Sequence, residues 1–387
     1  MDFELSEEQA GLRDAAHAVL ADACPPSVVR RCFDGGPDVV EEVRRELWAV
    51  LVGLDWAALA IPVDHGGLGL GPIEVGIVAE ELGRVVAPAP FLATCTQFVP
   101  ALRAAGSSWR LDEVAAGAVT GALALAEHGR WTADAVTTIA ARGPDGWVLS
   151  GTKSHVLDGA SADEVVVVAR APEGLGLFVV PGDRCRRRAV RTMDPTLPLA
   201  HLELDRVDVG GERALVEPGD PRAAAVVDHA LEHATAALAV STVATCRSIL
   251  DTTVQYALDR VQFGRPIGSF QAVKHRLADC LLAVERAGAL AWFALLTLAE
   301  DDGRRSVAVS MAKVAAGDCQ RLLVRDGLQL HGGVGFTWEH DLHLHLKRAA
   351  AGELLLGTAA DHRARLASLL DLVDAGAVPA DEDRGAA

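Results

Sequence analysis

Two glycine-containing motifs near the C-terminus carry residue types that suit cofactor binding. The first is the run QLHGGVGF at residues 329–336, in which Gln329 precedes the adjacent glycines Gly332 and Gly333. Glycine lets a backbone turn tightly and approach a ligand closely, because it has no Cβ. The run leads into a helical stretch that ends at the step Gly357–Thr358. The motif therefore predicts a turn that can approach a cofactor, joined to a helix.

The second motif is YALDRVQFGRPIGSFQAVK at residues 256–274. Arg260 could bind a phosphate in bidentate fashion, and Phe263 could stack on a planar ring. Gln271 could hydrogen-bond adenine or a ribityl chain. The same residues would also suit a polar helix cap with a buried phenylalanine. Taken alone, the motif leaves both interpretations open.

The histidines His331, His340, His343 and His345 raise the question of a metal site. His340 and His343 could share a helix face, but His343 and His345 do not face each other on a helix, and no carboxylate completes a ligand set. We expect no metal. The chain's seven cysteines include no C-x-x-C pair, which favours buried free thiols.

Composition limits the class of protein. With 387 residues, 50% of them hydrophobic, the chain can form two or three packed domains. A formal charge of −17 argues against a nucleic-acid-binding face, which would be basic. No apolar run reaches the ~18 to 20 residues of a membrane span, and the acidic, amphipathic start does not resemble a signal peptide. We expect a cytoplasmic protein that binds a small molecule or another protein.

Three compositional regimes divide the chain. Residues 1–118 have helical periodicity, with Ser6 as an N-cap. Residues 119–220 contain β-rich runs such as EVVVVARA and LGLFVVP at intervals that favour antiparallel strands. Residues 221–375 are helical again, and the small acidic tail 376–387 is expected to be disordered.

Within the first regime, the run IPVDHGGLGLG at 61–71 precedes Pro72. It lacks the Lys-Ser/Thr of a P-loop, so we interpret it as a structural turn, with Pro72 opening the next helix. In the third regime, no Gly or Pro occurs from 223 to 263, which permits a helix of up to ~60 Å. Further helical tracts are expected at about 273–300, 307–330 and 342–375, and together they predict a four-helix bundle.

Taken together, the two motifs, the ELSEEQ opening, the IPVDHGGLGLG run and the AEELGR run make the chain resemble the acyl-CoA dehydrogenase family of flavoproteins. The resemblance implies a mainly α fold with an N-terminal α domain, a β-barrel-like middle domain and a C-terminal four-helix bundle. It implies FAD as cofactor, bound between domains and across a subunit contact, and an electron-transfer flavoprotein as electron acceptor. The cofactor-binding residues implied by position are Arg260, Phe263, Gln271, Gln329, His331, Gly332, Gly333 and Thr358.

The same resemblance implies an α,β-dehydrogenation of an acyl-CoA thioester, for which a carboxylate must remove the α proton. The position where the family carries this base holds Leu356 here. The alternative position in some members, on the long helix, holds Ala234. Glu353, one turn before Leu356, and Glu232, two residues from Ala234, are candidates for a displaced base; surface glutamates are the alternative interpretation.

The middle domain also departs from the family pattern on the side that would meet the flavin ring. Ala126 replaces a threonine in ALAEHGRWTAD, and His155 and Leu157 replace the tryptophan and threonine of the motif read here as GTKSHVLDG. These changes remove hydrogen bonds or stacking to the ring. The motifs that serve the nucleotide end of FAD are intact.

The motifs on the flavin-ring side are thus altered, whereas those on the nucleotide side are intact. This difference suggests that the chain is the non-catalytic subunit of a heteromeric, α2β2 acyl-CoA dehydrogenase, similar to actinobacterial members that act on steroid side-chain thioesters. Such a chain would lend its C-terminal motifs to FAD whose ring and base lie in another polypeptide. A self-sufficient homo-oligomeric enzyme with Glu353 or Glu232 as base, and a non-redox binding or scaffold protein, stay open as alternatives.

Overall fold

The computed structural model describes residues 4–372. The predicted disordered tail 376–387 lies outside this range. Seven α-helices of the described chain precede the sheet, and the longest begin where the sequence predicts. Ser6 caps the first through a reciprocal pair of hydrogen bonds with Gln9, and Pro72 opens the fourth. These helices are α1 Glu7–Ala23, α2 Pro26–Asp34, α3 Pro37–Gly53, α4 Pro72–Arg84, α5 Phe91–Ala93, α6 Val99–Ala104 and α7 Leu111–Ala115.

The middle of the chain forms a mixed eight-stranded sheet with the order β6-β7-β3-β2-β4-β5-β8, and β1 pairs with β4 in parallel. Most pairs are antiparallel, as predicted, but β1 and the short β6 and β8 were not anticipated. Side chains from β1 to β5 and β7 share one core, so the sheet curls around it. The strands are β1 Gly121–Ala124, β2 Ile139–Arg142, β3 Gly146–Leu157, β4 Glu164–Ala171, β5 Gly174–Pro181, β6 Arg186–Val190, β7 Leu199–Gly210 and β8 Ala214–Val216.

Strand β4 explains how this sheet joins the helices before it. Its run of valines is buried on both faces, as in a central strand. Val165 and Val167 point into the core of the sheet. Val166 and Val168 belong to the larger core that the N-terminal helices form. The alternation of side chains along one strand therefore attaches two domains to each other.

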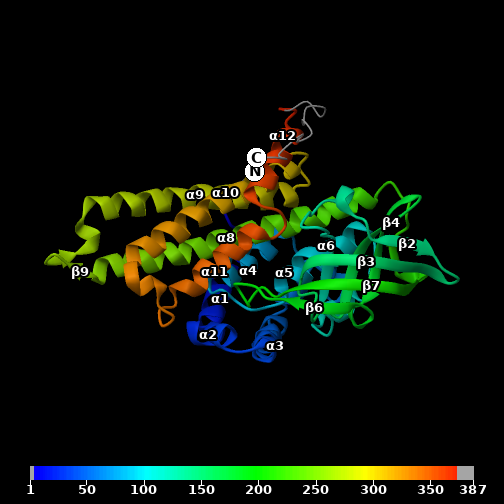
Figure 1. The fold of residues 1–387 in the computed structure, drawn as a ribbon, viewed down its shortest axis with the longest axis horizontal. Coiled ribbons are helices and arrows are strands. Elements are labelled where there is room, and N and C mark those ends of the chain that lie inside the picture. The colour runs from blue at the N-terminus through cyan, green and yellow to red at the C-terminus, as the bar shows by residue number, and fades with distance from the viewer. Residues whose placement is uncertain (1–3, 373–387) are drawn as a thin grey trace, which may run out of the picture.

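The C-terminal region is a bundle of long helices (Figure 1). Its longest helix, α8, has 37 residues and so spans about 55 Å. The predicted single helix over 342–375 is wrong, because the chain breaks between α11 and α12. Leu356 and Gly357 adopt positive φ angles of 58° and 92°, and Thr358 caps α12. The helices are α8 Ala223–Asp259, α9 Gln271–Ala299, α10 Arg305–His331, α11 Leu342–Leu354 and α12 Ala359–Leu369.

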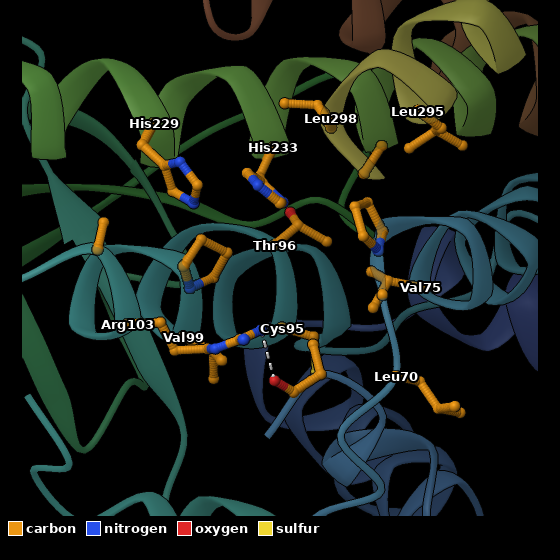
Figure 2. A pocket seen from close by; sticks show the side chains of 16 residues that line it. Leu70, Val75, Cys95, Thr96, Val99, Arg103, His229, His233, Leu295 and Leu298 are labelled. Carbon is orange, nitrogen blue, oxygen red and sulfur yellow. Dashed lines mark hydrogen bonds between the residues drawn. The ribbon is translucent and has the colours of Figure 1, made fainter. Parts of the chain in front are cut away.

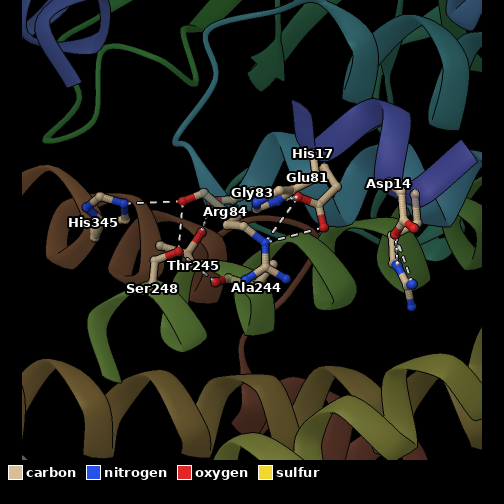
Figure 3. A network of polar contacts seen from close by, with 10 residues as sticks. Asp14, His17, Glu81, Gly83, Arg84, Ala244, Thr245, Ser248 and His345 are labelled. Carbon is tan, nitrogen blue, oxygen red and sulfur yellow. Dashed lines mark hydrogen bonds and ion pairs between the residues drawn. The ribbon is translucent and has the colours of Figure 1, made fainter. Parts of the chain in front are cut away.

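The end of α4 is tied to this bundle by polar contacts (Figure 3). Its last turn leaves carbonyl groups without helical partners. Thr245 donates to the Gly83 carbonyl (2.8 Å), and Ser248 donates to the Arg84 carbonyl (2.8 Å). A Cβ at Gly83 would lie 2.2 Å from the Ser241 carbonyl oxygen. Glycine in the AEELGR run therefore permits the close contact between α4 and α8.

Helix α9 is the one helix of residues 4–372 that could span a membrane by length and composition, and 39% of its apolar window is buried. It packs against α8 and α10, so many of its apolar side chains have a place in the bundle. All seven cysteines are buried free thiols, as predicted.

Candidate active site

The two halves of the expected cofactor site lie at opposite ends of the helix bundle. One half, which we call the distal end, comprises the hairpin β9 Val261–Gln262 and β10 Arg265–Pro266, the first turn of α9, and residues 329–336 at the end of α10. Figure 1 shows the hairpin at the extremity of the molecule farthest from the sheet. These segments meet because α9 and α10 run antiparallel.

The hairpin turn presents Phe263 to the outside. Phe263 and Gly264 have φ angles of 54° and 78°, as in the two-residue turns that suit hairpins. The Phe263 ring is 92% exposed, so the alternative of a buried phenylalanine in a helix cap is wrong. Its ring contacts Phe270 edge-on, and the Arg265 guanidinium lies 4.3 Å from the Phe270 ring centre.

The rest of the distal end is open and suits a phosphate-containing group. Arg260 and Gln329 are exposed. A Cβ added at Gly332 or Gly333 would meet no atom within 4 Å. Helix α9 begins at Gln271 without a side-chain cap, so its first N–H groups and the positive end of its dipole are available to an anion.

His331 differs from its neighbours in this set, because it is buried beneath the turn. Its Nδ1 contacts the Gly327 carbonyl at 2.8 Å, and its ring stacks on Tyr256 at 4.3 Å. Burial lowers the pKa of His331. The residue supports the Gly332–Gly333 turn from below. Among the described residues, no group of three or more side chains is arranged to hold a metal ion.

The other half of the site lies where α8 faces the break between α11 and α12. Leu356 and Ala234, the two positions at which the family pattern would place a base, line the same small cavity, which we call the leucine cavity. Its volume is about 10 Å³. None of the described residues that line it carries a carboxylate. Its other apolar walls include Leu92, Trp131, Leu157, Leu238 and Leu355.

The altered residues of the middle domain reach this cavity only in part. Leu157 lines it, together with Trp131, which the sequence reasoning did not single out. His155 does not; its ring contacts His201 instead, at 5.2 Å. Ala126 is buried, and its carbonyl accepts the Ser154 N–H (2.8 Å). The sequence feature that could have identified Trp131 is a bulky indole in an otherwise polar loop.

A larger cavity of about 530 Å³, which we call the polar cavity, adjoins the leucine cavity through Leu356 and Trp131. Glu232 lines it and is buried. One carboxylate oxygen of Glu232 accepts from Arg305 Nε at 3.0 Å, and the other accepts from the Ser306 hydroxyl. Both oxygens are thus engaged in structural bonds.

Glu353 and Thr358 have structural partners near the same loop. The Glu353 carboxylate accepts the Ala359 N–H (3.0 Å) and packs against Gly317 of α10. It lines neither the leucine cavity nor the polar cavity. Thr358 accepts the Asp361 N–H as the N-cap of α12. Ala359, the next residue, packs against Gly317 near the middle of α10, so Thr358 is separated from the Gly332–Gly333 turn at the C-terminal end of that helix.

The separation of the halves is set by α8. At ~1.5 Å per residue, Arg260 lies about 39 Å along the helix from Ala234. The leucine cavity has room for about one water molecule, so its residues do not fit a flavin ring. The exposed aromatic, guanidinium and glycine groups of the distal end do fit a nucleotide supplied from outside the chain.

These features are those of a known class of oxidoreductase. Residues 6–122 match the family model described as acyl-CoA dehydrogenase, N-terminal domain, and residues 224–370 match that for the C-terminal domain. The chain therefore belongs to the acyl-CoA dehydrogenase family, whose members are FAD-dependent dehydrogenases. The predicted family and fold class are confirmed.

Particular relatives narrow the comparison. The acyl-CoA dehydrogenase IpdE2 of Mycobacterium tuberculosis is 33% identical over 368 residues, which cover 94% of this chain and 97% of the relative. A chain of the ChsE4-ChsE5 complex from the same organism superposes with a TM-score of 0.86 at 26% identity, covering 97% of this chain and 100% of that one. A chain of a structure described as a variant of the Tcur3481-Tcur3483 steroid ACAD gives 0.83 at 30% identity, covering 95% and 98%.

Proposed function

We propose that this chain is the base-lacking subunit of a heteromeric acyl-CoA dehydrogenase. In this assembly the distal end holds part of an FAD whose ring, base and acyl-CoA thioester lie in a second acyl-CoA dehydrogenase subunit. The observation that carries the proposal is the leucine cavity, in which Ala234 and Leu356 converge without a carboxylate.

The chemistry explains why this observation matters. A thioester α carbon is a weak acid, so its proton is removed only by a positioned base close to the reacting atoms. Alanine and leucine have no atom that can accept a proton. Bound FAD supplies the acceptor for the β hydride. In this chain the leucine cavity measures only about 10 Å³. Arg260 and Phe263 are exposed and the Gly332–Gly333 turn is open, so these groups remain available for the nucleotide of a neighbour.

A partner surface is available on α9. Leu282 is 68% exposed and Leu281 is 44% exposed, on a helix whose opposite face lies in the bundle core. Adjacent exposed leucines on a long helix suit a protein interface. The chain is similar to a chain of the ChsE4-ChsE5 complex and to a chain of the Tcur3481-Tcur3483 steroid ACAD. These similarities support an α2β2 heteromer with a bulky, steroid-like acyl group as substrate. An electron-transfer flavoprotein as acceptor and a cytoplasmic location complete the proposal.

The test is to co-express the chain with an acyl-CoA dehydrogenase subunit encoded beside it and to compare two surface variants. Phe263→Ala removes the exposed ring at the distal end, and Ile139→Ala removes a 58% exposed side chain from the sheet. We expect Phe263→Ala to lower the FAD content and turnover of the complex at least about tenfold, and Ile139→Ala to change neither. Equal behaviour of the two variants would contradict the proposal.

A self-sufficient enzyme is the second candidate, because Glu232 and Leu356 line the same polar cavity. It predicts FAD and turnover from the chain alone, with turnover lost and flavin retained in Glu232→Gln. A non-redox scaffold predicts no flavin reduction by any acyl-CoA, with or without a partner.

A further inference from the structure

A third cavity lies on another face of α8 and has no part in the proposed dehydrogenase site. It is about 340 Å³ in volume, within the usual size range of small-molecule sites. His229 and His233 line it, one helical turn apart, and Figure 2 shows both rings directed toward Arg103 and Val99. We call it the histidine cavity. Its apolar walls include Val75, Val99, Leu295 and Leu298.

The polar groups of this cavity are available to a ligand. The rings of His229 and His233 lie 4.4 Å apart, and neither forms a hydrogen bond with another described residue. Burial lowers the pKa of His233 to about 3 and lowers that of His229, so both rings are neutral at pH 7. A neutral imidazole has one N–H donor. The nearby Arg103 donates one bond to the Ala60 carbonyl (2.9 Å), and its guanidinium has further N–H groups.

The histidine cavity and the leucine cavity share Thr96 as a wall. The leucine cavity, at about 10 Å³, is too small to let an acyl chain pass. The histidine cavity is therefore a separate site, and the exposed Arg103 forms part of its wall. Around His233 the neighbouring arginines Arg103 and Arg305 both disfavour protonation, whereas at His229 the Glu232 carboxylate opposes their effect. The N–H donors of the two neutral rings and of Arg103 favour an oxygen that accepts hydrogen bonds.

We propose that the histidine cavity binds an apolar molecule carrying an acceptor oxygen, a ketone or a carboxylate, with His229, His233 and Arg103 as donors to that oxygen. The apolar body of the ligand would fill the space between Val75, Val99 and the α9 leucines. This proposal goes beyond the dehydrogenase role and does not depend on it, because no residue of the distal end or the leucine cavity takes part apart from the shared wall.

The experiment compares three probes of one shape, 2-decalone, decalin-2-carboxylate and decalin, by titration into the full chain with histidine ring nitrogens labelled for NMR. We expect the ketone or the carboxylate to bind at least about tenfold more tightly than decalin, which is the loss expected for about one good hydrogen bond. The His229 and His233 signals should move on binding. Equal affinity for all three probes, or no binding by any, would overturn the proposal.

Variants locate the site. His233→Leu, and separately His229→Leu at a less buried position, should reduce the preference for the oxygen-bearing probe at least about fivefold while leaving the affinity for decalin unchanged. His201→Leu, which alters the histidine pair on the sheet, is the matched control and should leave the preference intact. Circular dichroism establishes that each variant is folded. A preference unchanged in both cavity variants would refute the assignment.

Discussion

Replacing Arg348 of α11 tests how the three domains are joined at the end of the bundle that holds the leucine cavity. Its Nε lies 2.7 Å from the Asp194 carboxylate, and its Nη2 donates to the Ala87 carbonyl (2.8 Å) and the Thr196 hydroxyl (2.6 Å). Arg348 is 4% exposed and Asp194 is 0% exposed at their side chains. One guanidinium therefore contacts the sheet region and the N-terminal region from the bundle.

Replacing Arg348 by Met keeps most of the side-chain volume but leaves the Asp194 charge buried and unpaired. Breaking a buried ion pair in this way costs about 3–5 kcal/mol in the free energy of unfolding. The matched control is Arg363→Met, which removes a more exposed pair of similar length, in which Arg363 Nη2 contacts both carboxylate oxygens of Asp318 at 2.6 and 2.7 Å. An exposed pair contributes about 0–1 kcal/mol.

The assay is urea unfolding followed by circular dichroism, with ΔΔG taken from the shift in midpoint at constant slope. The double variant Arg348→Met, Asp194→Asn completes a cycle and should recover part of the loss, because the second change removes the unpaired charge. A cost below about 1 kcal/mol for Arg348→Met, equal to that of Arg363→Met, would refute the interpretation of this contact as a buried interdomain tie.

Two further predictions concern the middle domain and the lost base. Although burial opposes ionisation, bonds from Lys153, Thr137 and Thr138 hold the pKa of Glu127 at about 2. This pKa is below the ordinary value, so the stabilisation is present above pH ~4.3 and lost as pH falls through about 2. In an acid titration, Glu127→Gln should be less stable than the unaltered chain at pH 7 and should lose less stability over this pH range. An unchanged acid profile would contradict the assignment. Leu356→Glu in the chain alone should restore neither flavin nor turnover in a dye-reduction assay, because Trp131 and Leu157 still line a leucine cavity of only about 10 Å³; activity from this single change would show that only the base is missing.

Local signals in the sequence predicted much of the fold. The Ser6 cap, Pro72 and the uninterrupted stretch after residue 223 place α1, α4 and α8 correctly. Strand β6 was missed because it is rich in arginine, a composition typical of an edge strand rather than of a buried one. The break between α11 and α12 was also missed, although Gly357 followed by a Thr cap is a recognisable signal for the end of one helix and the start of another.

The candidate site was only partly predictable, because its geometry depends on contacts between distant segments. Position in the motifs indicated that Leu356 and Ala234 replace a base, but their convergence on one cavity requires the packing of α8 against the loop before α12. Trp131 and the His229–His233 pair carry no motif, and only the folded chain shows what they line. The exposure of Phe263 likewise depends on a hairpin that the sequence left open.

The central claim is that this chain supplies half of a shared flavin site, and the visible spectrum of the purified chain tests it most directly. The flavin-to-protein ratio should be measured for the chain alone and for the complex with the subunit encoded beside it. We predict that the chain alone carries essentially no FAD and gives no turnover with any acyl-CoA, and that the complex gains both. Stoichiometric FAD with turnover in the chain alone would contradict the account.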